Sequence, residues 1–113
     1  MEEDISGLAA SLLEGTLTAE ALLDRCLDRI RRIDPRLNSF VALDEAGARA
    51  GAKASDERFA AGAPRSALEG VPLSVKDSIL VAGMPATWGS RALAGFVPDR
   101  DELPVASRPL QSI

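Results

Sequence analysis

The 113-residue sequence contains no histidine and a single cysteine, Cys26. Without histidine, the chain cannot build a Ser-His-Asp triad, a Cys-His dyad or an imidazole-based zinc site. One cysteine excludes an internal disulfide and fits a reducing compartment. A base or nucleophile in this chain must therefore be a carboxylate, a lysine, a serine or a threonine, and the sequence predicts neither a metal site nor a cofactor.

The chain also lacks a basic surface and a long apolar run. Its formal net charge is −4, whereas nucleic-acid-binding surfaces usually carry a basic stripe. No segment approaches the ~20 apolar residues of a membrane span, and the acidic start, residues 1–4, is the reverse of a signal peptide's basic start. We expect a soluble, cytoplasmic protein that binds neither nucleic acid nor membrane directly.

Aromatic residues make up only 4% of the chain, although 46% of it is apolar. Much of the apolar fraction is alanine, which adds little buried area per residue. The core should therefore be thin, and the length fits one small domain or a piece of a larger one.

Three helices are predicted in the first half. Asp4 caps the first and Gly15 ends it, and Thr18 caps a second that runs to Asp34-Pro35. The apolar face of the first helix comprises Ile5, Leu8, Ala9, Leu12 and Leu13, and that of the second Leu22, Leu23, Cys26, Leu27, Ile30 and Ile33. A third helix is expected over about 45–61, after Asp44.

The third helix carries Ala46, Ala50 and Ala54 at four-residue spacing. Its two glycines would each cost about 1 kcal/mol relative to alanine, so we expect close packing of this small-residue face. Two short strands are predicted, over residues 38–43 and 71–75.

Lys76 follows the second strand directly, and Asp77 comes next. Lys-Asp pairs at strand ends are usually exposed and contribute only ~0–1 kcal/mol, so residue type alone favours a surface pair. No phosphate-binding G-x-x-x-x-G-K-[ST] motif and no S-x-x-K motif is present. Ser74, two residues earlier on the same strand face, is a candidate partner for a Ser-Lys pair.

Four segments together resemble the N-terminal part of the amidase signature family. They are RIDPRLNSFVAL, DERFAAG, LEGVPLSVKDSI and AGMPATWGS, in this order and at family-like spacing between about Ile5 and Leu103. The resemblance implies an α/β fold, of which this chain supplies N-terminal helices and the first strands of a mixed sheet with helices around it. It also implies a hydrolase of carboxamide C–N bonds other than peptide bonds.

The resemblance assigns roles to individual residues. Lys76 stands where the family has the base of a Ser–cis-Ser–Lys triad, whose two serines come from a later glycine- and serine-rich segment that these 113 residues lack. Such a lysine must be neutral to accept a proton, and burial beside an apolar strand is one way to achieve this. We expect the chain as given to be inactive.

Other matched residues are expected to support the site. Adjacent strand residues point to opposite faces, so Asp77 should bond to the backbone of the following loop and not to Lys76. Thr87, Gly89 and Ser90 match the family's T-x-G-S ending and are interpreted as loop supports. Trp88 is interpreted as a packing anchor, with pocket lining as the alternative.

After Leu103 the match ends. Residues 1–103 are predicted to be the N-terminal part of an amidase domain. Residues 104–113 form a divergent tail, typical of a frameshift or premature stop, in which Pro104 can start a helix and Pro109 disrupts it.

Several functions stay open at this point. The alternatives to an amidase acting on a small-molecule amide are a protein like the A-type subunit of glutamyl-tRNA amidotransferase, an inactive chain that serves only as a folding or partner-binding fragment, and a self-contained Ser74-Lys76 hydrolase. For the full-length protein, a homodimer is a further open expectation.

Overall fold

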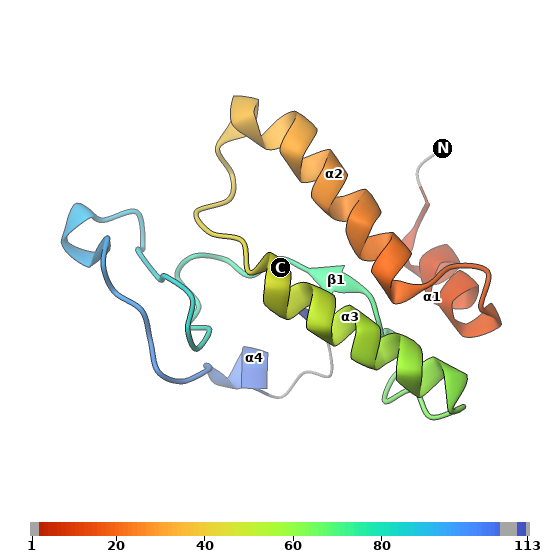
Figure 1. Cartoon of the computed structure of the whole chain (residues 1–113). Helices are drawn as coiled ribbons and strands as arrows, with labels where there is room; N and C mark the ends of the chain where they lie inside the picture. The colour runs from red at the N-terminus through yellow and green to blue at the C-terminus, as the bar shows by residue number, and fades with distance from the viewer. Residues whose placement is uncertain (1–2, 107–110, 113) are drawn as a thin grey trace.

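The structure, a computed structural model, describes residues 3–106 and 111–112, and three helices dominate it (Figure 1). In chain order its elements are α1 (Ile5–Glu14), α2 (Ala19–Leu37), α3 (Glu45–Ala60), β1 (Pro72–Leu73), the 3-10 helix η1 (Arg91–Leu93), α4 (Leu103–Ala106) and β2 (Gln111–Ser112). Strands β1 and β2 pair in parallel, Pro72 with Gln111 and Leu73 with Ser112. The three predicted helices are confirmed, whereas a larger mixed sheet stays a prediction.

The predicted helix starts are confirmed by their caps. Asp4, Thr18 and Asp44 each accept a hydrogen bond from the backbone N–H three residues later, at 2.7, 3.1 and 3.0 Å. Such caps satisfy N–H groups that have no partner within the helix. Gly15 ends α1 in the left-handed region, at φ 79°.

The predicted end of α2 is wrong, because the helix passes through Pro35 and stops at Leu37. Asn38 adopts φ 51° and its N–H donates to the Asp34 carbonyl oxygen at 2.7 Å, which closes the last turn. The Asp34 carboxylate then accepts from the backbone N–H groups of Ser39 and Phe40. Pro35 donates no backbone hydrogen bond, and the bonds made by Asp34 stabilise the helix end that follows it.

The core lies where α1 and α2 meet α3, and α2 and α3 run side by side in Figure 1. It consists of Leu12, Leu17, Ala19, Leu22, Leu23, Leu27, Ala48 and Ala52. Burying a leucine contributes about 1.5–3 kcal/mol, so the leucines supply most of the apolar stabilisation. The small side chains of α3 let α2 approach closely.

The small-residue face of α3 is not the predicted one. Ala46 and Ala50 are exposed, and the buried positions are Ala48, Ala52 and Ser55. A Cβ atom at Gly47 would lie 2.1 Å from an Asp44 carboxylate oxygen, so the N-cap explains this glycine and helix packing does not.

A side chain of α3 also caps α2. Asp56 accepts hydrogen bonds from the backbone N–H groups of Ala19 at 2.7 Å and Glu20 at 3.1 Å. These donors belong to the first turn of α2, where no intrahelical acceptor is available. The start of α2 is therefore bonded to the middle of α3.

The two strand predictions are corrected. Residues 38–43 run as irregular chain, and Val41 and Leu43 in this segment are exposed. The predicted strand 71–75 is reduced to the two residues of β1. Strands require neighbours to pair with, and among the described residues only β2 offers a partner edge.

The described residues of the tail form α4, which begins one residue before Pro104. The predicted disruption at Pro109 lies outside the described residues. In the described part of the chain, no helix combines the length and apolar character needed to cross a membrane.

Candidate active site

Lys76 lies in irregular chain, three residues beyond the end of β1. The prediction that this lysine is buried at a strand end is wrong for this chain, because its side chain is exposed. The physical reason is that β1 ends at Leu73 and no described strand covers residues 74–81. The Ile79 backbone N–H donates to the Lys76 carbonyl oxygen at 2.9 Å, whereas the Lys76 amine has no hydrogen-bond or ion-pair partner among the described residues.

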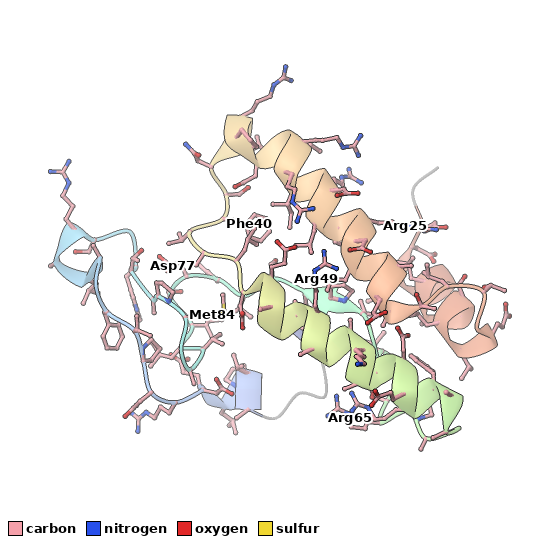
Figure 2. All side chains as sticks on the ribbon, in the orientation of Figure 1. Arg25, Phe40, Arg49, Arg65, Asp77 and Met84 are labelled. Atoms are coloured by element: carbon pink, nitrogen blue, oxygen red, sulfur yellow. The ribbon has the colours of Figure 1, made fainter. Side chains whose placement is uncertain are left out.

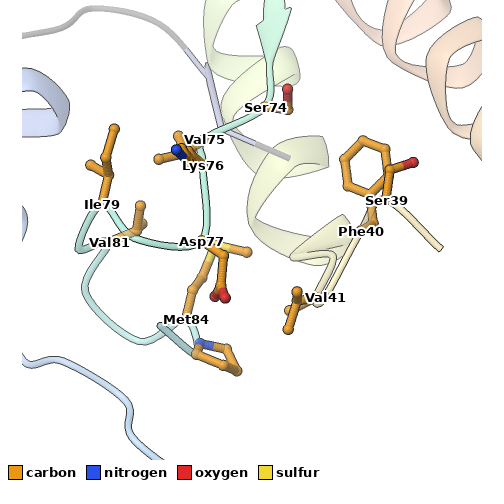
Figure 3. A pocket seen from close by; sticks show the side chains of 12 residues that line it. Ser39, Phe40, Val41, Ser74, Val75, Lys76, Asp77, Ile79, Val81 and Met84 are labelled. Carbon is orange, nitrogen blue, oxygen red and sulfur yellow. The ribbon is translucent and has the colours of Figure 1, made fainter. Parts of the chain in front are cut away.

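Lys76 does line a cavity of about 620 Å³ between residues 39–42 and residues 74–85 (Figure 3). The wall is mainly apolar, with Asp77, Ser39 and Ser74 as its other polar side chains. The apolar lining residues are Phe40, Val41, Ala42, Val75, Ile79, Val81, Met84 and Pro85. A mostly apolar cavity with a few polar groups is the usual form of a small-molecule site.

Asp77 bonds to the following loop, as the sequence predicts. Its carboxylate accepts a hydrogen bond from the Thr87 backbone N–H at 2.8 Å and a second from the Thr87 hydroxyl. The hydroxyl bond, followed by the backbone bond, holds the pKa of Asp77 below its usual range. The carboxylate is thus kept as an anion that closes the loop 77–87 beside Lys76, while its role in a reaction stays a prediction.

Gly89 and Ser90 continue this loop away from the cavity. The Gly89 N–H donates to the Thr87 hydroxyl at 3.3 Å, and the Ser90 hydroxyl caps η1 by accepting from the Ala92 N–H at 3.3 Å. Neither residue lines the cavity. Trp88 is 61% exposed at φ 53°, so its interpretation as a packing anchor is wrong, and it does not line this cavity.

Ser74 and Lys76 form no hydrogen bond with each other in the described structure, and the Ser74 hydroxyl points away from the Lys76 amine in Figure 3. Both side chains are exposed. A Ser-Lys pair requires the hydroxyl and the amine within hydrogen-bond reach, about 2.6–3.2 Å. The alternative of a self-contained Ser74-Lys76 site therefore has no geometric support.

A buried carboxylate that the sequence analysis did not identify precedes β1. Glu69 is 1% exposed. It pairs with Arg58 of α3 at 2.7 Å and with Arg65 at 3.0 Å, and it accepts from the Ser55 hydroxyl at 2.6 Å. Only a weak sequence pattern could have identified this residue. Glu69 and a glycine precede an apolar run, and two arginines lie 11 and 4 residues upstream.

The hydrogen-bond partners of Glu69 determine the direction in which its pKa is shifted. Burial alone would raise the pKa of this carboxyl, but the hydrogen bonds from Arg58, Arg65 and Ser55 outweigh burial and hold the pKa far below its usual range. The Arg65 backbone N–H adds a further bond at 3.0 Å. The ionised carboxylate therefore ties the connector 65–70 to α3 and determines where β1 and the lysine loop begin.

Gly70 allows the connector 65–70 to lie close to α2 and α3. It adopts φ 79°, and a Cβ atom there would lie 3.0 Å from the Ala19 Cβ and 3.3 Å from the Phe59 ring. A side chain at this position would therefore be strained in its backbone and crowded by α2 and α3. The connector, both long helices and β1 meet at this point.

The described structure combines helices with a parallel strand pair, as an α/β protein does, and the family profile described as Amidase matches residues 21–107. The chain belongs to the amidase signature family.

Two named proteins illustrate the similarity. The chain is 49% identical over 94 residues to the A-type subunit of the glutamyl-tRNA(Gln) amidotransferase of Myxococcus xanthus, a match that covers 83% of this chain and 19% of the relative. It superposes on the peptide amidase of Stenotrophomonas maltophilia with a TM-score of 0.89 at 34% identity, covering 99% of this chain and 23% of that one. The chain thus spans about a fifth of the length of the curated relatives that it matches.

A further solved structure extends the fold comparison. A protein from a vestigial complex, described in connection with the origins of an s-triazine catabolic enzyme, superposes with a TM-score of 0.91 at 23% identity. That match covers 97% of this chain and 25% of the other. At this identity the likeness concerns the fold alone.

Proposed function

We propose that this chain contributes the lysine of a site that cleaves carboxamide C–N bonds, in which Lys76 is the base that accepts the proton of a serine nucleophile. The observation that carries the proposal is the place of Lys76, which lines the 620 Å³ cavity. Its segment, VKD, resembles the family's lysine segment and lies within the matched residues 21–107. The nucleophile and the bridging serine of a Ser–cis-Ser–Lys mechanism would come from sequence outside these 113 residues.

For Lys76 to act as a base, its amine must meet two requirements. The amine must be held at a constant position, and the bonds of Asp77 to Thr87 support this because they close the loop that follows the lysine. The amine must also lose its exposure to water, since only the neutral form accepts a proton. The exposed Lys76 of this chain therefore needs covering by further polypeptide, and we expect the 113 residues alone to be inactive.

The proposal is tested by grafting. This chain would replace the matching residues of the Myxococcus xanthus relative and, separately, of the Stenotrophomonas maltophilia peptide amidase, and ammonia release from simple carboxamides would be measured. We expect an active chimera to lose activity by at least about a thousandfold on Lys76→Ala, because the triad loses its base. The matched control is Lys53→Ala, an exposed lysine of α3, which should leave activity unchanged.

Two different results would contradict the two parts of the proposal. Activity that survives Lys76→Ala within about tenfold would contradict the role of Lys76. The ungrafted chain is assayed in parallel, and measurable hydrolysis by it would contradict the requirement for further polypeptide.

A second candidate function is that of an amidotransferase component, which passes ammonia to a misacylated tRNA. The observation in its favour is the 49% identity to a relative named as a glutamyl-tRNA(Gln) amidotransferase subunit. It is tested in the Myxococcus xanthus chimera, assembled with that organism's other subunits, by amidation of glutamyl-tRNA(Gln). Conversion that depends on Lys76 would favour this function, while free hydrolysis without conversion would favour a simple amidase.

A third candidate is an inactive chain that binds a partner. The observation that favours it is the group of exposed large apolar residues, including Val41, Leu43, Phe96 and Val97. Size-exclusion chromatography and circular dichroism separate the cases, because a compact monomer indicates an independent module and an expanded or aggregating chain indicates a fragment.

A further inference from the structure

Helix α2 carries two parallel rows of side chains. The arginine row follows intervals of four, three and four residues, which places its members on one helix face. The apolar row has the same spacing one residue later, and its first two members, Cys26 and Ile30, pack against the core. The arginine row is Arg25, Arg29, Arg32 and Arg36, and the apolar row is Cys26, Ile30, Ile33 and Leu37.

The apolar row is only partly covered. Ile33 is 40% and Leu37 66% exposed. A groove of about 280 Å³ runs along the row and is also lined by Arg29, Asp34, Ser39 and Phe40. The Asp34 carboxylate in this lining already accepts hydrogen bonds from the backbone N–H groups of Ser39 and Phe40. Figure 2 shows Phe40 on the segment that leads from α2 to α3, and Arg25 on the side of α2 away from α3.

Most of the arginine row is free of counter-charges. Arg25 pairs with Glu3 at 3.2 Å. The exposed side chains of Arg29, Arg32 and Arg36 have no ion pair or hydrogen bond with any residue that the structure describes. In a chain of net charge −4, these three unpaired cations form a positively charged row beside the apolar residues. The groove itself also contains the carboxylate of Asp34, whose hydrogen bonds to the backbone N–H groups of Ser39 and Phe40 are already made.

We propose that this face of α2 docks an acidic amphipathic helix of another polypeptide. The partner's apolar side chains would enter the groove along Ile33 and Leu37, and its carboxylates would pair with Arg29, Arg32 and Arg36. The two rows span about 16 Å of α2, which about three turns of a partner helix would match. Charge complementarity selects this occupant, since a symmetric second copy would bring arginine rows together, and a nucleic acid would leave the apolar row uncovered.

The test uses the 113-residue chain and two fluorescent synthetic helical peptides. Both carry leucine in an i, i+3, i+4, i+7 pattern, flanked by glutamate in one peptide and by lysine in the other. Fluorescence anisotropy should show saturable binding of the acidic peptide alone, weakened by added salt. Reversal of the free arginines (R29E/R32E/R36E) should weaken binding at least about tenfold.

Two further variants complete the design. The matched control K53E/R91E/R100E makes the same change of net charge at exposed positions outside α2 and should bind within about twofold of the parent chain, because those charges lie away from the groove. I33S/L37S shortens the apolar row without a charge change and should also weaken binding about tenfold. Circular dichroism establishes that each variant retains its helices.

The proposal is overturned by any of four results. These are equal binding of the two peptides, an equal loss in the matched control, a chain dimer that R29E/R32E/R36E abolishes, or tighter binding of a single-stranded RNA than of the acidic peptide.

Discussion

At the scale of single residues, the buried carboxylate of Glu69 joins α3 to the connector that leads into β1. The side chains of Arg58, Arg65 and Ser55 donate hydrogen bonds to its carboxylate oxygens, at donor–acceptor distances of up to 3.3 Å. Removing one member of a buried ion pair leaves the other members without their counter-charge. Glu69 is therefore the residue at which the fold is most sensitive to a change of charge.

Glu69→Gln keeps the size of the side chain and removes its charge. We expect the free energy of unfolding to fall by about 3 kcal/mol, at the lower end for a broken buried pair, because Arg58 and Arg65 remain partly exposed and can be hydrated. Urea unfolding followed by circular dichroism measures this. The control Glu57→Gln, an exposed acid of α3, should change stability by less than about 0.5 kcal/mol, and an equal loss in both variants would contradict the prediction.

The same carboxylate predicts a pH dependence. The pKa of Glu69 is lowered in the folded state, whereas the unfolded chain binds this proton at about pH 4.3. The stability that Glu69 contributes is fully present above that pH and is lost as the pH falls, because the unfolded state then binds a proton that the folded state does not. Unfolding measured from neutral pH to about pH 3 should show a steeper decline for the parent chain than for Glu69→Gln. Parallel curves would contradict this.

The sequence predicted individual interactions correctly where the two partners lie close together in the chain. The bond from Asp77 to the loop follows from its place next to Lys76, and the caps Asp4, Thr18 and Asp44 follow from spacing. The cluster around Glu69 joins residues from two segments, and only the fold brings them together. The exposure of Lys76 could not be predicted either, because an apolar segment before a lysine does not show whether other segments cover it.

At the scale of elements, the end of α2 depends on one left-handed residue. Asn38 has φ 51°, a conformation that asparagine tolerates and that a β-branched side chain disfavours. We expect Asn38→Val to lower the free energy of unfolding by about 1–2 kcal/mol and Asn38→Gly to change it by less than about 0.5 kcal/mol, as measured by thermal or urea unfolding. Equal effects of valine and glycine would show that backbone conformation does not control this helix end.

The loop 77–87 is held by the two bonds between Asp77 and Thr87. Asp77→Ala removes both acceptors, so the Thr87 amide should exchange its hydrogen at least about tenfold faster, since a lost hydrogen bond of about 1.4 kcal/mol corresponds to that factor. Hydrogen exchange followed by NMR measures the change. The amide of Gly7, capped by Asp4 in α1, is the internal control and should be unaffected.

Strand prediction failed for a reason that also belongs to this scale. Helices α1 to α3 form because their bonds and caps lie within short stretches of sequence. A strand depends on a neighbour, and the apolar segments 38–43 and 71–75 find almost none among the described residues. Their composition predicts a buried sheet, whereas the described residues of this chain, which spans about a fifth of the length of its curated relatives, pair only β1 with β2.

At the scale of the whole molecule, the chain is more open than a domain of its size. Its accessible surface is 7383 Å², whereas a folded monomer of 11.9 kDa is expected to expose about 5,900 Å². The radius of gyration is 14.9 Å, against about 13 Å for a compact domain of this length. Exposed large apolar residues in the loops after α2 and β1 include Val41, Leu43, Trp88, Phe96 and Val97.

This openness predicts dye binding. We expect the isolated chain to enhance the fluorescence of the apolar dye ANS while it still unfolds cooperatively in urea, because the exposed apolar residues belong to an ordered structure. A grafted chimera, in which further polypeptide covers these residues, should bind less dye per molecule. Absence of enhancement by the isolated chain would contradict the exposure of this surface.

The carboxylate of Asp56, which accepts the first amides of α2, has a consequence for how the chain acquires its structure. A peptide that contains α2 but stops before α3 would leave these two donors to water, and its leading turn should fray. The two long helices thus depend on each other. Neither is expected to persist at full length in a nascent chain that contains only one of them, or after a protease has cut between them.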